Sequence, residues 1–131
     1  MDTWREKAAE LLPELLDEIT TESPMSLWIE ISLRLEDTYD RKPLDDNFIG
    51  RIYKFAFWCL EQPETSSVET DLGSAVAAAF LENIPLNSRT AADLHRWLSI
   101  EDFDGFAALF QYHLDENEFA KFRTEFVTAR K

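Results

Sequence analysis

The stretch RIYKFAFWCLEQP, Arg51 to Pro63, gathers six aromatic or large apolar side chains around the only cysteine of the chain. Its apolar residues recur at helical spacing and do not alternate as they would in a strand. Pro63 follows at the point where a helix ends. The stretch therefore predicts a helix over about 45–62, and its apolar content places that helix, together with the alanine-rich helix predicted over about 67–84, at the centre of the fold.

The same helical spacing extends over nearly all of the 131 residues, and the chain contains only three glycines and five prolines. A chain with many hairpin turns would need more of both. The length suits one domain, and a hydrophobic content of 45% supplies its core. We predict an all-α fold, a compact bundle of six to seven short helices, in a single domain that spans 1–131.

Cap signals place the helices along the chain. Most consist of a cap residue with an acid three positions later, because these two side chains satisfy unpaired backbone N–H groups. The pairs are Thr3/Glu6, Ser66/Glu69, Thr90/Asp93, Ser99/Asp102 and Asp115/Glu118. Ser23-Pro24 matches a cap followed by proline at the first helical position. The predicted helices are about 3–20, 24–39, 45–62, 67–84, 91–97, 100–112 and 116–129.

Two prolines refine the predicted helix ends, and the apolar spacing predicts the inward faces of the first two helices. Pro13 is expected to kink or split the first helix, and Pro85 to follow the end of the fourth. The inward face of the first helix is predicted to be Leu11, Leu12, Leu15, Leu16 and Ile19. In the second helix the inward residues are Leu27, Trp28, Ile31 and Leu35, with Glu30, Arg34 and Asp37 pointing away.

The formal charge of −13 is unevenly distributed. It is −8 over 1–40, +2 over 41–60, −10 over 61–118 and +3 over 119–131. Such a field repels nucleic acid and anionic membranes, so neither is expected as a partner. The charge serves solubility or, in the more specific interpretation, attraction to a basic partner protein. The sequence leaves monomer and dimer open.

One cysteine forms no internal disulfide, so nothing indicates an oxidising compartment. The first residues, MDTWREKAAELL, carry acids where a signal peptide has a basic start and a long apolar run. The longest apolar run, Phe55 to Leu60, is too short to cross a bilayer. We expect a soluble, cytoplasmic protein.

Few residues suggest chemistry. Cys59 lies near the C-terminal end of its helix, where the dipole disfavours a thiolate, so we interpret it as a buried small hydrophobe. His113, together with Asp115, is a weak candidate for a surface cation site. Glu82 is a weak candidate too, and we expect it to be partly buried, to contact Arg89 or Arg96 or to cap a helix. No catalytic set, metal motif or cofactor motif is present, so no enzyme activity, metal or cofactor is predicted.

Trp58 has two interpretations. It lies outside the apolar sector of its helix, in the sector of Arg51 and Lys54, with Phe57 near the edge of the apolar sector. Either the helix is enclosed on nearly all sides and Trp58 is core, which we favour, or Phe57 and Trp58 form an exposed aromatic patch. Flanked by Arg51 and Lys54, that patch would be an interaction surface.

Three segments, IYKFAFWCLEQP, DLGSAVAAAFLENIP and DLHRWLSIEDFDGFAALFQYHLDENEF, resemble a family of small bacterial proteins of unknown function. The shared features are an aromatic-Trp-Cys helix, an Ala-rich helix ending in FLENIP and a Trp-Leu-Ser turn. The resemblance covers about 44–126 and implies an α-helical domain without a catalytic residue to carry over. In size and charge the chain also resembles immunity proteins encoded beside toxins.

The leading functional prediction is a non-enzymatic protein-interaction module with an acidic surface, of an immunity or regulatory type. The alternative is a small-molecule or metal-binding helical bundle, with His113 and nearby acids or a pocket lined by Trp28 and Trp58. A third hypothesis is an enzyme with an acid–base site near Glu82 or His95.

Overall fold

A computed structural model describes residues 2–65 and 71–131 of the chain, and these ranges contain helices and no strand. The predicted all-α fold is confirmed. The α-helices are α1 (Thr3–Leu11), α2 (Leu16–Thr21), α3 (Pro24–Thr38), α4 (Asp46–Leu60), α5 (Leu72–Ala79), α6 (Ser88–Asp93), α7 (Ile100–Gly105), α8 (Ala107–Phe110) and α9 (Glu116–Arg130). The 3₁₀-helices are η1 (Pro13–Leu15), η2 (Leu81–Leu86) and η3 (Leu94–Arg96).

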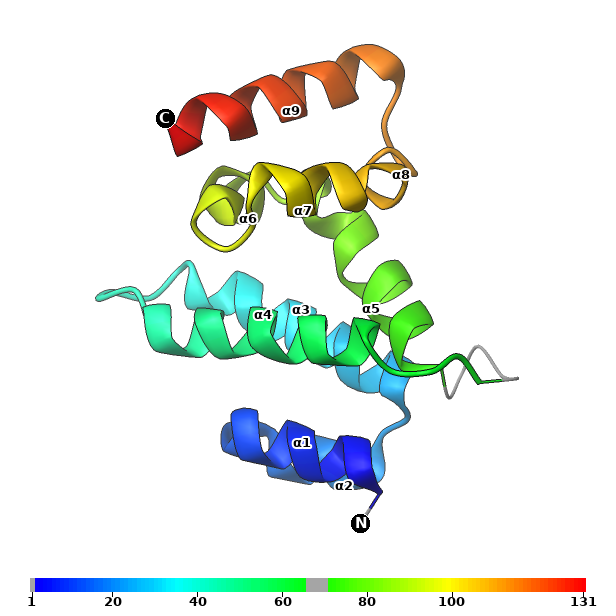
Figure 1. Ribbon diagram of the computed structural model, residues 1–131. Coiled ribbons are helices and arrows are strands. Elements are labelled where there is room, and N and C mark those ends of the chain that lie inside the picture. The colour runs from blue at the N-terminus through cyan, green and yellow to red at the C-terminus, as the bar shows by residue number, and fades with distance from the viewer. Residues whose placement is uncertain (1, 66–70) are drawn as a thin grey trace.

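The helices stack in three layers (Figure 1). The middle layer consists of α3 and α4, which lie side by side, and α1 and α2 lie on one side of it. The short helices α6 to α8 and the long α9 lie on the other side, and α5 leads from the middle layer to them. Because layers cover α4 from both sides, this helix is central, as its sequence predicts.

Three predicted long helices are found within two residues of their expected ends, namely α3, α4 and α9. The predicted helix over 3–20 is split at Pro13, where the short η1 separates α1 from α2. Proline lacks an N–H, and its ring collides with the carbonyl of the preceding turn, so an α-helix does not run through it.

The chain after residue 71 contains shorter helices than expected. The predicted helix over 67–84 starts outside the described residues, and its described part ends at Phe80, whose φ of −123° and ψ of −69° leave the α region. Pro85 does not follow a helix end but lies inside η2. The predicted helix over 100–112 is interrupted at Phe106, which separates α7 from α8.

Several predicted caps are confirmed. The side chain of Ser23 accepts the N–H of Ser26, with Pro24 at the first helical position. Reciprocal capping boxes join Ser99 to Asp102 and Asp115 to Glu118. These caps are local in sequence, so short-range pattern suffices to find them.

Two predicted caps are wrong. The cap position of α1 is Asp2, without a side-chain hydrogen bond, and not Thr3. Asn87, which accepts the N–H of Thr90, starts α6 earlier than the predicted Thr90/Asp93 pair would. The pair Ser66/Glu69 lies outside the described residues.

The core contains two aromatic clusters. Trp28 of α3 stacks on Phe55 of α4 with ring centroids 5.4 Å apart, and on Phe80 at 5.3 Å. In the third layer Phe103 packs against Phe126 at 4.5 Å and against other phenylalanines of α8 and α9. The predicted inward face of the first helix is confirmed except at Leu16, which is 47% exposed on α2 after the break at Pro13 changes the direction of the chain.

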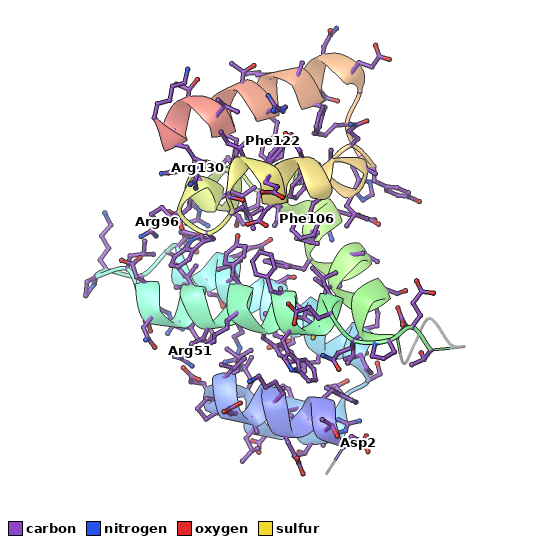
Figure 2. The ribbon with its side chains drawn as sticks, viewed as in Figure 1. Asp2, Arg51, Arg96, Phe106, Phe122 and Arg130 are labelled. Carbon is purple, nitrogen blue, oxygen red and sulfur yellow. The ribbon has the colours of Figure 1, made fainter. Side chains whose placement is uncertain are left out.

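Polar contacts tie the layers together. Arg51 lies between the middle layer and α1–α2, and Arg96 lies on the opposite side of the middle layer (Figure 2). Asp93, at the end of α6, accepts hydrogen bonds from Tyr39 Oη at 2.5 Å, Trp97 Nε1 at 3.0 Å and Arg96 Nε at 2.5 Å. Arg96 also pairs with Asp46 of α4 at 2.9 Å. Asp93 is therefore a junction between the middle layer and the third.

Candidate protein-binding groove

Helix α3 is apolar on two sides. Its inner side consists of the predicted Leu27, Trp28, Ile31 and Leu35, all buried. Its outer side carries Met25, which is half-buried, Ile29, which is 50% exposed, and Leu33, which is 51% exposed. Residues four apart lie above one another on a helix, so these three form one stripe. An apolar stripe opposite the core is typical of a helix that packs against partners on both sides.

The stripe forms one wall of a groove because α5 approaches α3 closely. The hydroxyl oxygen of Ser32 lies 2.8 Å from the carbonyl oxygen of Ala79, so the two backbones are separated by small residues only. The groove has a volume of about 360 Å³. Its lining is Met25, Ile29, Ser32, Leu33, Glu36, Ala78, Ala79 and Asn83. We call it the α3–α5 groove.

A smaller hollow of about 20 Å³ continues the α3–α5 groove toward α6. It shares Ser32, Glu36 and Asn83 with the groove and ends at Asn87 and Thr90. Buried apolar side chains, including Phe80 and Ile84, form its floor. The accessible surface is thus continuous from Met25 at the start of α3 to the cap of α6.

The segments that form the groove are acidic. Residues 22–40 and 71–87 together contain seven acids and one base, a formal charge of −6. That base, Arg34, is held by Glu18 and Glu30, each 3.1 Å away. Glu36 and Asp37 are exposed and have no ion-pair partner in the described parts of the chain. Glu36 lines the groove, whereas Asp37 lines a separate hollow with Arg34 and Arg41. The groove therefore combines exposed apolar side chains with the carboxylate of Glu36 in an acidic part of the chain.

The predicted surface around Trp58 is divided between two layers. Phe57 and Trp58 are both half-buried. Phe57 packs toward the third layer, with its ring centroid 6.0 Å from that of Phe106. Trp58 lies beside α1, in a hollow that it shares with Thr3 and three further residues of that helix. Phe57 and Trp58 therefore contact different layers, and neither is fully buried nor fully exposed.

The two cations of that predicted surface differ. Arg51 donates to both carboxylate oxygens of Glu14, at 2.7 and 2.6 Å, and to the carbonyl oxygen of Leu11 at 2.7 Å. This pairing keeps the pKa of Glu14 below its ordinary value and links the middle layer to the first. Lys54 is exposed and has no ion-pair partner within the described ranges. A binding function for these residues stays a prediction.

Glu82 and His113 are brought together, with Oε1 and Nε2 3.8 Å apart. Asp115 is instead the cap of α9, and the expected contact of Glu82 with Arg89 or Arg96 is wrong, because those arginines pair with Asp40 and Asp93. Within residues 2–65 and 71–131 no three His, Cys, Asp or Glu side chains are placed to hold a metal ion.

The remaining residues that the sequence singled out make ordinary packing or local polar contacts. Phe55 stacks on Trp28 and, at 6.1 Å, on Trp58, so it fills the space where a ligand pocket between the two tryptophans was expected. His95 Nδ1 lies 3.0 Å from the carbonyl oxygen of Ala92 in its own turn. Cys59 is fully buried, and burial raises the pKa of its thiol to about 12.

The groove residues were not among those singled out from the sequence. The available signal was the spacing of Met25, Ile29 and Leu33 along the helix opposite the inner face. That spacing shows a second stripe but not what lies beside it, since the other wall comes from α5, more than 40 residues later.

The chain was compared with protein-family models, curated proteins and solved structures, and none of them matches it. Among the described residues, no helix has the length and apolar content that crossing a bilayer requires.

Proposed function

We propose that this protein is a non-enzymatic protein-interaction module that binds a basic partner protein through the α3–α5 groove. The observation that supports the proposal is the combination, in one groove, of the apolar stripe Met25, Ile29 and Leu33 with the exposed carboxylate of Glu36. Exposed apolar patches rimmed by polar groups are typical of protein-binding surfaces.

The two parts of the groove have different effects on binding. Burial of Ile29 and Leu33 against a partner removes apolar surface from water and supplies affinity, at about 25 cal/mol per Å². The acids, together with the net charge of −13, attract a cationic partner from a distance and raise the association rate. Binding should therefore weaken as salt is added, without vanishing.

An immunity-type or regulatory function in the cytoplasm belongs to this proposal. Such proteins act by covering a surface of their partner, which needs a complementary face and no catalytic group. The family suggested by the segments around Trp58, the Ala-rich helix and the Trp-Leu-Ser turn fits the same class, since it offers no catalytic residue.

The test is affinity capture with a matched pair of variants. Leu33→Asp places a charge in the groove, whereas Leu16→Asp makes the same change at a leucine of similar exposure, 47% against 51%, on α2. The immobilised wild type should retain a basic protein from a lysate of the source organism, Leu16→Asp should retain it equally, and Leu33→Asp should lose it. Capture that survives Leu33→Asp, or that is indifferent to salt, would refute the proposal.

A further inference from the structure

We infer that the segment of the partner that occupies the α3–α5 groove is a basic amphipathic α-helix. The inference rests on the proposed function and specifies its ligand. It follows from three properties of the groove, which are the spacing of its apolar wall, the small residues of its floor and the sign of its charge.

The wall repeats at a helical distance. Met25, Ile29 and Leu33 are successive members of one row of side chains four residues apart. Each step along that row advances about 6 Å, at 1.5 Å per residue. Helices pack by placing such a ridge into the groove between equivalent rows of another helix, whose spacing is the same. The wall from Met25 to Glu36 is about 16 Å long, enough for about three turns of a partner helix.

The floor admits large side chains. Ser32, Ala78 and Ala79 line it with side chains of at most two heavy atoms, beside the taller Met25, Ile29 and Leu33. A partner helix can therefore insert Leu or Phe side chains from positions i, i+4 and i+7. An added strand would need a free sheet edge to receive its backbone hydrogen bonds, and the described residues form no strand.

The charge selects a cationic helix and disfavours a second copy of this chain. Glu36 lines the groove, and no cation forms an ion pair with it in the described parts of the chain. Lys or Arg residues beside the apolar stripe of the partner would neutralise it. Two copies meeting at this groove would bring two Glu36 carboxylates together on two chains of charge −13.

Three synthetic peptides of about 18 residues, long enough for the groove, distinguish the effect of an amphipathic helix from the effect of positive charge. The first carries Leu at i, i+4, i+7 and i+11 with Lys at flanking positions. The second has the same composition scrambled so that the leucines share no face, and the third has Glu in place of Lys. Fluorescence anisotropy should show binding of the first peptide, with the scrambled peptide at least about tenfold weaker.

Variants of the protein locate the peptide. Leu33→Asp, and independently Ile29→Asp, should weaken binding of the first peptide about tenfold or more, whereas Leu16→Asp leaves it unchanged. Glu36→Lys should weaken the Lys peptide and strengthen the Glu peptide. Far-UV circular dichroism and thermal unfolding verify that each variant is folded. If either Leu33→Asp or Ile29→Asp does not fold, the other still tests the groove.

The outcomes are distinguishable from those of the proposed function. Equal binding of the amphipathic and scrambled peptides, or binding indifferent to Leu33→Asp and Ile29→Asp, would overturn the helix inference. If these peptides fail while capture of a basic protein still depends on Leu33, the interaction module stands and its ligand is not a helix. If capture fails as well, both proposals fall.

Discussion

At the scale of single residues, Asp93 accepts hydrogen bonds from three side chains, of which Tyr39 lies at the end of α3 in the middle layer. Burial alone would raise the pKa of its carboxyl group, but the hydrogen bonds from Arg96, Tyr39 and Trp97 outweigh burial and hold the pKa below its ordinary value. The ionised form of this carboxyl group is therefore more stable in the folded state than in the unfolded state. A carboxyl group of this kind makes folding stability depend on pH.

We expect the free energy of unfolding to fall as the pH is lowered through about 4 and below. The unfolded pKa of Asp is about 3.9 and the folded value is lower, so the contribution of Asp93 is complete above 3.9 and is lost as the pH falls through the folded pKa. Asp93→Asn should cost about 1–3 kcal/mol at neutral pH and flatten the acid limb. Urea unfolding at several pH values measures both effects, with the exposed Asp37→Asn as control. An equally steep acid limb in Asp93→Asn would contradict this assignment.

The thiol of Cys59 should be inert in the folded protein. Its side chain is fully buried, and burial raises its pKa to about 12, so almost no thiolate exists near neutral pH. Ellman's reagent at about pH 8 should detect no thiol in the native protein and one thiol per chain after denaturation. Rapid reaction of the native protein would show that Cys59 is accessible.

At the scale of elements, the contact between α4 and the turn after η3 depends on Gly50. A Cβ atom added at Gly50 would lie 3.1 Å from Cζ3 of Trp97. Trp97 has little freedom to withdraw, because it stacks on Tyr53 with centroids 5.7 Å apart and donates to Asp93. The glycine therefore serves close packing between the middle layer and the third.

Gly50→Ala should consequently destabilise the protein, although glycine to alanine inside a helix ordinarily stabilises by about 0.5–1 kcal/mol. Gly105→Ala is the matched control, since a Cβ atom there meets nothing within 4 Å. Chemical denaturation of both variants should give opposite signs, or a loss at Gly50 with no change at Gly105. A gain in stability at Gly50 would mean that Trp97 moves aside without cost.

How far an element was predictable depended on whether its determinants are local. The starts of α3, α7 and α9 follow from Ser23-Pro24, Ser99 and Asp115, whose partners lie three residues away. The breaks after α5 and α7 have no such local signal in the sequence. The backbone leaves helical φ and ψ values at Phe80 and Phe106, although the apolar spacing of the sequence continues. There the packing of Phe80 on Trp28 competes with local preference.

At the scale of the whole molecule, the net charge of −13 acts against the folded state. Like charges held in a compact volume repel one another, and dissolved salt screens this repulsion. Ion pairs such as Arg51–Glu14 lose attraction at the same time, but the excess of acids over bases is twofold, 26 against 13. Repulsion therefore outweighs attraction.

The melting temperature should rise when sodium chloride increases from about 0.01 M to about 0.2 M, over which the screening length falls from about 30 Å to below 10 Å. Glu36→Gln combined with Asp37→Asn removes two unpaired charges, so it should raise the melting temperature at low salt and reduce the gain from added salt. Circular dichroism at both salt concentrations measures this. A melting temperature that decreases with salt would show that ion pairs dominate.

The sequence by itself determined the helical class, the central position of α4, the long helices and the caps of α3, α7 and α9. Those features depend on spacing and on contacts within one turn, which a single segment contains. Only the tertiary structure decided that Arg51 binds Glu14, 37 residues away, that Leu16 faces solvent and that Phe57 and Trp58 point to different layers. It also decided the groove. An apolar stripe shows that a helix face favours a packing partner. The free energy that selects the partner comes from packing between segments distant in sequence. At Ile29 and Leu33 that packing leaves the face of α3 exposed.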